Sequence, residues 1–157
     1  MTTPDSVFEF DVHARQSTLL KQDRIVGNYD PALYHSSRFE FSARDGVKVP
    51  VSMVYRRGLY RAGQNPAYLY AYGAYGLSSP PYFRKSIFSL IDRGFVFVII
   101  HVRGGQELGR KWYDQGRLRN KKNTFNDFID GTRFLAENGH IDANRVFASG
   151  GSAGGLL

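Results

Sequence analysis

Cysteine is absent from the 157-residue sequence, which excludes disulfide bonds and thiolate metal sites within it. Long hydrophobic runs are absent as well. The longest, residues 95–100, is far shorter than the roughly 20 residues that a membrane-spanning helix needs. The first residues, Met-Thr-Thr-Pro-Asp-Ser, lack the basic and then apolar pattern of a secretory signal. We therefore expect no membrane partner and a location in the reducing cytoplasm.

Histidine and acidic residues are also scarce. No two of the four histidines have the spacing of metal ligands, so we expect no metal ion and no other cofactor. The 14 acidic residues face 21 basic ones, which gives a net charge of +7. A basic cluster can bind nucleic acid, but this one matches no known motif, and its glycines and Trp112 are typical of a structured loop. We expect no nucleic-acid partner. The cluster consists of Arg110, Lys111, Arg117, Arg119, Lys121 and Lys122.

Hydrophobic and aromatic residues are plentiful, at 42% and 15%, as in a globular domain that can bury a core. Residues 7–21 alternate about a polar turn and predict a hairpin with no visible sheet to join. Residues 22–37 have the composition of a linker, with Gly27, Asn28 and Pro31 among them. Residues 38–43 and 49–55 alternate around a turn and predict a second, antiparallel hairpin.

Strands and helices then alternate along the chain. Apolar runs predict strands over 66–72, 95–102 and 145–148, and helical spacing predicts helices over 83–92 and 124–138. A hairpin followed by strand–helix alternation indicates an α/β fold in which helices cover a parallel sheet.

The second helix carries its own boundary signals. Thr124-x-x-Asp127 resembles a capping box, and Gly139 is expected to end the helix. Apolar side chains at 125, 128, 129, 135 and 136 share the face expected to pack on the sheet.

Ser152 is the strongest candidate for a chemical role. It lies in Gly150-Gly151-Ser152-Ala153-Gly154, directly after the last predicted strand, and Gly-x-Ser-x-Gly in that context is typical of a nucleophile elbow. The tight turn that exposes the hydroxyl needs small neighbours, and the N–H of Ala153 could stabilise a developing oxyanion. The alternative is a glycine-rich segment with an incidental serine.

A serine of this kind needs a base, and none is evident in the chain. His13, His35, His101 and His140 all precede Ser152, whereas in this type of fold the acid and base follow the serine. We expect His101, at the end of a buried strand, to be structural and His140 to lie in an exposed turn.

Two loops follow predicted strands and could contribute to a site. Tyr70-Ala71-Tyr72-Gly73 comes where this kind of fold builds part of its oxyanion hole, although its aromatics could simply pack a turn. Arg103 ends the next strand, where it could bind either a substrate or a helix end.

Taken together, these motifs closely resemble the prolyl oligopeptidase family of serine peptidases. The resemblance covers nearly the whole chain, and residues 43–52 and the arginine-rich loop after Arg103 look like the oligopeptidase B branch. Gln106 departs from the pattern, because the family commonly has a glycine there. The motifs are Tyr70-Ala71-Tyr72-Gly73, His101 to Tyr113, Lys121 to Asp127, and Gly150 to Gly155.

The resemblance implies a division of the chain. Members of this family have a β-propeller before an α/β-hydrolase domain. Residues 1–24 would be the end of the propeller, residues 25–37 a linker, and residues 38–157 the N-terminal half of the hydrolase domain.

The resemblance also implies roles for three residues. Ser152 would be the nucleophile, while the Ala153 N–H and the Tyr72 hydroxyl would form the oxyanion hole. The family hydrolyses short peptides, and oligopeptidase B prefers the bond after Lys or Arg. The catalytic Asp and His and the acidic specificity residues follow position 157 in the family, so we expect this polypeptide by itself to be inactive.

Two other interpretations remain open from the sequence. One is part of an esterase or exopeptidase of the same superfamily. The other is a non-catalytic binding or regulatory half-domain whose exposed sheet pairs with another chain.

Overall fold

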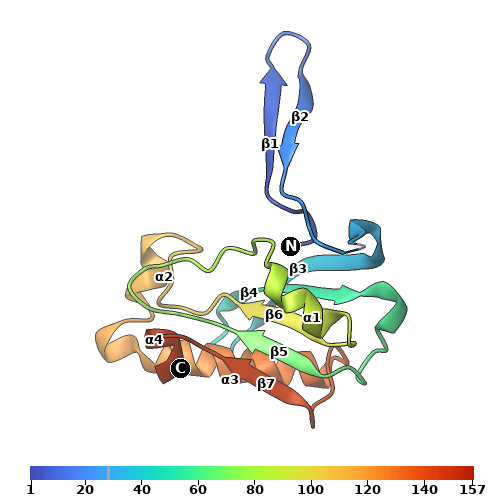
Figure 1. Ribbon diagram of the computed structural model, residues 1–157. Helices are drawn as coiled ribbons and strands as arrows, with labels where there is room; N and C mark the ends of the chain where they lie inside the picture. The colour runs from blue at the N-terminus through green and yellow to red at the C-terminus, as the bar shows by residue number, and fades with distance from the viewer. Residues whose placement is uncertain (28) are drawn as a thin grey trace.

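The computed structural model of the protein describes residues 1–27 and 29–157, and its centre is a five-stranded mixed sheet (Figure 1). The strand order is β3-β4-β6-β5-β7. The strands β3 and β4 form the predicted hairpin, β4 runs antiparallel to β6, and β5 runs parallel to both β6 and β7. The bounds are Tyr34–Ser42 for β3, Lys48–Arg56 for β4, Ala67–Tyr70 for β5, Val96–Ile100 for β6 and Val146–Ser149 for β7.

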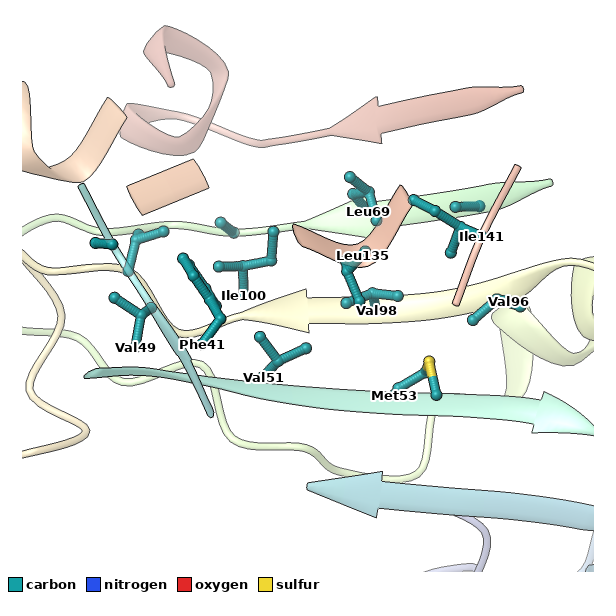
Figure 2. Close-up of a cluster of buried hydrophobic side chains, with 14 of the residues drawn as sticks. Phe41, Val49, Val51, Met53, Leu69, Val96, Val98, Ile100, Leu135 and Ile141 are labelled. Atoms are coloured by element: carbon teal, nitrogen blue, oxygen red, sulfur yellow. The ribbon is translucent and has the colours of Figure 1, made fainter. Parts of the chain in front are cut away.

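The central strand β6 explains why the sheet is covered on both faces. Its five residues are all buried, and they alternate between two hydrophobic clusters. Val96, Val98 and Ile100 belong to the larger cluster, which Figure 2 shows together with side chains from β3, β4 and β5. Phe97 and Ile99 belong to the second cluster on the opposite face. These features agree with the predicted α/β fold.

One helix is the main cover of each face. The helix α3 (Lys122–Glu137) contributes Leu135 to the larger cluster, and α1 (Phe88–Ile91) contributes its two end residues to the second. Gly131 lets α3 approach the sheet closely, because a Cβ there would lie 2.9 Å from the ring of Phe41. A 3-10 turn, Lys85–Ile87, precedes α1, so the helix predicted over 83–92 is present in a shorter form.

The predicted start of α3 is wrong. The helix begins at Lys122, two positions before the expected cap, and Thr124 and Asp127 lie inside it with no exposed surface. Both side chains bond to the segments after β6 instead of capping the helix. The predicted apolar face is wrong at Ile129, which is 42% exposed. Gly139 does end the helix, with φ of 69°.

The segment before the sheet also differs from the prediction. Strand β3 begins at Tyr34, so the linker predicted to reach residue 37 ends earlier. Tyr34 is buried, and its hydroxyl donates to Asp92, which anchors the strand to the end of α1. A 3-10 turn, Pro31–Leu33, precedes the strand. Asn28, named in the predicted linker, lies outside the described residues.

The first hairpin is confirmed and stands apart from the sheet (Figure 1). It pairs β1 (Ser6–Asp11) with β2 (Gln16–Gln22), and nearly all of its side chains are exposed. Its assignment to a propeller stays an interpretation that rests on the resemblance.

Two short helices flank the candidate site. The helix α2 (Arg110–Asp114) was expected as a loop, and it buries Trp112, whose Nε1 donates to the Val102 carbonyl at 3.2 Å. The helix α4 (Ala153–Leu156) directly follows Ser152. None of the helices in the described part of the chain has the length and apolar content needed to cross a membrane.

Candidate active site

Ser152 occupies the sharp turn between β7 and α4, and it is exposed. Its φ of 53° and ψ of −123° belong to a backbone region that non-glycine residues rarely adopt and that is associated with functional sites. The turn closes only with small neighbours. A Cβ on Gly150 would lie 2.1 Å from the Gly154 carbonyl oxygen, so position 150 requires glycine.

The elbow packs against the end of β5 and against the segment after it, which carries Tyr72. Strands β5 and β7 are parallel neighbours, and Tyr70 lies opposite Ser149. A Cβ on Gly154 would lie 2.9 Å from the Ala71 carbonyl oxygen and 3.4 Å from Cδ2 of Tyr72. The ring of Tyr72 therefore lies beside the first turn of α4. Two residues selected from separate parts of the sequence come together here.

Ala153 is the first residue of α4, so its N–H has no partner within the helix. It also lines an open hollow of about 360 Å³ beside the elbow. Aromatic rings and two cationic side chains make up much of this hollow. Its lining residues are Ala74, Tyr75, Tyr113, Gly116, Arg117, Leu118, Lys121, Ala153 and Leu156.

The four histidines have other surroundings in the described part of the chain. Among the hydrogen bonds of the described residues, none joins Ser152 Oγ to a histidine. His13 is in the exposed turn of the first hairpin and His35 is in β3. His140 lies in the turn after α3, as predicted, but its predicted exposure is wrong: its ring stacks on Phe39 with centroids 5.0 Å apart, and burial lowers its pKa.

His101 is buried, as predicted, and belongs to a polar cluster with Ser52 and Glu107. His101 Nε2 lies 2.8 Å from Ser52 Oγ, and its Nδ1 lies 3.6 Å from Oε1 of Glu107. A serine, a histidine and a carboxylate thus adjoin, but Ser52 is only 2% exposed and cannot meet a substrate.

Glu107 links two loops near the site. Its Oε1 accepts the Ser79 N–H at 2.8 Å, which ties the segment after β5 to the segment after β6. Burial raises the pKa of this carboxyl, but His101 and the Ser79 amide outweigh burial and hold the pKa below its ordinary value. Glu107 is therefore a carboxylate at neutral pH.

Arg103 was predicted to bind either a substrate or a helix end, and in the structure it binds a helix. Its side chain is 3% exposed and pairs with Asp127 of α3 through two contacts, Nε–Oδ2 at 2.9 Å and NH2–Oδ1 at 2.6 Å. It also donates to Asp45 at 2.6 Å, and this hydrogen bond lowers the pKa of that carboxyl. The N–H donors of the Arg103 guanidinium are thereby hydrogen-bonded within the protein.

The basic cluster is not one continuous free surface. Arg110 and Arg117 both pair with Asp114, at 3.3 and 2.9 Å. The ammonium group of Lys121 instead donates to the Gly73 carbonyl oxygen at 2.5 Å. The sequence predicts no separate role for Lys121, because nothing in the pattern of lysines distinguishes one that contacts a distant carbonyl.

Comparison with known proteins decides the family. The family model described as prolyl oligopeptidase family matches residues 81–157, a range that includes Ser152. Dipeptidyl aminopeptidase BI of Pseudoxanthomonas mexicana is 49% identical over 158 residues, covering 100% of this chain and 22% of that protein. The chain belongs to the prolyl oligopeptidase family.

Other members of the family agree with this assignment. Protease 2 of Moraxella lacunata is 38% identical over 157 residues, which cover 100% of this chain and 23% of that protein. The structure of oligopeptidase B from Leishmania major is 38% identical, with a TM-score of 0.91 over 99% of this chain and 22% of that chain. The names of these relatives are those of peptidases. The chain spans less than a quarter of the length of these relatives.

Proposed function

We propose that Ser152 is the nucleophile of a serine peptidase that works by acyl transfer. The observation that carries this proposal is the exposed serine in a strained turn, enclosed by required glycines and adjoining Tyr72. Ser152 Oγ would attack the peptide carbonyl carbon. The resulting oxyanion would accept hydrogen bonds from the Ala153 N–H and the Tyr72 hydroxyl.

The tetrahedral intermediate would then break its C–N bond. The amine would leave with a proton, the acyl group would remain on Ser152 Oγ, and water would release it as the free acid. This sequence needs a base that first takes the serine proton. The described residues place no histidine at Ser152, so we propose that the 157-residue polypeptide by itself hydrolyses no peptides at a measurable rate.

For the substrate, we propose short peptides, cleaved after Lys or Arg. Support comes from the likeness to oligopeptidase B. The hollow beside Ala153 is not suited to that basic side chain, because its charged lining residues are Arg117 and Lys121. The basic side chain would therefore have to bind on the other side of the elbow. The same proposal includes a cytoplasmic location, which the lack of cysteine supports.

A second candidate is an exopeptidase. The identity of 49% with a protein named dipeptidyl aminopeptidase BI, against 38% with protease 2, favours it. Such an enzyme would need a free amino terminus two residues before the cleaved bond. The two candidates share the nucleophile and the oxyanion hole, and they differ only in the substrate that they accept.

The test is a chimera in which these 157 residues replace the 158 aligned residues of the Pseudoxanthomonas mexicana relative. It would be assayed with an amino-blocked arginyl amide and with a dipeptidyl amide whose amino terminus is free. Turnover of the first substrate supports the endopeptidase, and turnover of the second alone supports the exopeptidase. Ser152→Ala should abolish either activity.

The matched control is Ser149→Ala, at an exposed serine three positions earlier in β7. This variant should keep the parent rate within about twofold, because surface substitutions usually change little. Equal turnover by the Ser152→Ala and parent chimeras would contradict the proposal. A folded chimera without turnover would favour the non-catalytic binding interpretation.

A further inference from the structure

Lys121 stands out among the basic residues near the elbow. It precedes α3, and its ammonium group reaches a carbonyl 48 residues earlier in the sequence, that of Gly73. The Nζ–O distance is 2.5 Å, and Nζ also lies 3.3 Å from Oγ1 of Thr124. Among the ion pairs of the described residues, none includes Lys121. Its charge is directed at a backbone carbonyl instead.

Gly73 is enclosed on its other sides. Its φ of 67° is left-handed, and a Cβ there would lie 2.4 Å from Cγ2 of Thr124 and 2.6 Å from Cγ2 of Val102. A Cβ on Gly104 would lie 2.1 Å from the Gly73 carbonyl oxygen. The segment after β6 therefore packs against this oxygen while Lys121 donates to it. Few orientations of the Gly73 peptide fit between these groups.

The orientation of Gly73 bears directly on Tyr72. Tyr72 and Gly73 share the peptide before the Gly73 Cα, whereas the Gly73 carbonyl belongs to the peptide after it. Holding this carbonyl while Thr124 and Val102 crowd the Gly73 Cα therefore restricts the Tyr72 backbone and the direction in which its side chain leaves. That side chain packs on Gly154, two positions after Ser152. An oxyanion donor is effective only when it is held in place before the charge develops.

We propose that Lys121 is a positioning residue for the oxyanion hole. Its ammonium group holds the Gly73 carbonyl and thereby keeps Tyr72 aimed at the substrate oxyanion. The inference rests on the proposed function, because it assigns Lys121 to the same site. It predicts that Lys121 affects the rate of the chemical step and leaves substrate binding nearly unchanged.

The first test needs no catalysis. In the 157-residue chain, the Gly76 N–H donates to the Gly104 carbonyl, so the Gly76 amide reports on the contact between the two loops. The Gly104 N–H donates to the Trp112 carbonyl, so the Gly104 amide reports on the segment after β6 that packs against Gly73. Lys121→Met keeps the apolar stem and removes the ammonium group. It should speed hydrogen exchange at both amides about tenfold, because local opening depends on local stability.

The control is Lys122→Met at the exposed neighbouring position, which should leave both amides unchanged. Exchange in β6 should be the same in all three proteins. Unchanged exchange at Gly76 and Gly104 in Lys121→Met would overturn the positioning role whatever the outcome of any activity assay.

The second test measures kinetics in the chimera. Lys121→Met should lower kcat about tenfold, less than the loss of a whole oxyanion donor, with KM within twofold. Lys121→Arg, which keeps a cationic donor, should restore part of the rate. In a Tyr72→Phe background, Lys121→Met should have little further effect, because residues that act through one another are not additive.

Two kinetic outcomes would overturn the inference. A raised KM with unchanged kcat would mean that Lys121 binds substrate from the hollow that it lines. An additive loss on top of Tyr72→Phe would mean that it does not act through Tyr72. If the chimera showed no turnover that depends on Ser152, the proposed function would be wrong. Hydrogen exchange would still test separately whether Lys121 holds the Gly73 carbonyl in place.

Discussion

Individual glycines set the geometry around Ser152. Gly150, Gly151 and Gly154 look equivalent in the sequence, yet their surroundings differ. A Cβ would meet a backbone oxygen at Gly150 and at Gly154, whereas nothing lies within 4 Å of one built on Gly151. The Gly-x-Ser-x-Gly pattern was sufficient to predict the elbow. The different requirements of its glycines depend on the adjoining strand β5, and a local pattern does not reveal them.

This difference predicts opposite effects of the same substitution. Gly154→Ala should lower the free energy of unfolding by about 1–3 kcal/mol, because the added methyl group would press on the Ala71 carbonyl and the Tyr72 ring. Gly151→Ala should be neutral or stabilising by about 0.4–1 kcal/mol, because it restricts the unfolded chain without a clash. Urea denaturation of both variants measures the difference, and equal values would contradict the described contacts.

Glu107 predicts a dependence of stability on pH. Because the folded pKa lies below the ordinary value near 4.3, the ionised carboxylate stabilises the fold above that value. The contribution disappears as the pH falls through the folded pKa. Glu107→Gln should therefore be less stable than the parent at pH 7, with a gap that narrows below about pH 4.

Urea denaturation at pH 7, 5, 4 and 3 would show this convergence. Glu137→Gln, at an exposed position near the end of α3, is the control and should show no such trend. A gap between Glu107→Gln and the parent that stays constant across the series would contradict the role of the carboxylate charge.

Helices and strands were predicted well where one chain segment determines them. The alternation of β3 and β4 and the apolar run of β6 gave correct strands, and Gly139 gave the correct end of α3. The start of α3 was wrong because Thr124 and Asp127 serve tertiary contacts. Asp127 meets Arg103 at a separation of 24 residues, which no local pattern reports. The helix α2 was missed for a similar reason, since it is organised around the burial of Trp112.

The pair of Arg103 and Asp127 joins α3 to the end of β6. Asp127→Asn would leave the guanidinium buried with only its contact to Asp45 as a charge partner. We expect a loss of about 3–5 kcal/mol in the free energy of unfolding, because one partner of a buried pair is removed. The matched control is Asp130→Asn, which breaks the more exposed pair with Arg44.

The control should be much less destabilising, because exposed pairs contribute little. Thermal or urea denaturation of both variants measures the two losses in the free energy of unfolding. Similar losses in the two variants would show that the buried pair of Arg103 and Asp127 does not hold α3 to the sheet.

At the scale of the whole molecule, the sequence predicted the class of fold and the turn that carries Ser152, while packing brought the candidate site together. Four segments that are distant in the sequence lie next to one another in space. They are the loop with Tyr72, the loop with Arg103, the start of α3 and the elbow. The resemblance implies that Tyr72 and Ser152 serve one site, and the parallel pairing of β5 with β7 places the segments that carry them at the same edge of the sheet. The contact of Lys121 with Gly73 emerged only from the fold.

We propose that Ser152 is a nucleophile and that the described residues of this polypeptide do not supply its base. Covalent labelling of the chimera with a fluorophosphonate tests it most directly, because the reagent phosphonylates an activated serine and releases fluoride. Mass spectrometry should find one adduct, on Ser152, in step with loss of activity, and none on the 157-residue chain alone. An active chimera whose Ser152 stays unmodified while another serine is labelled would contradict the account.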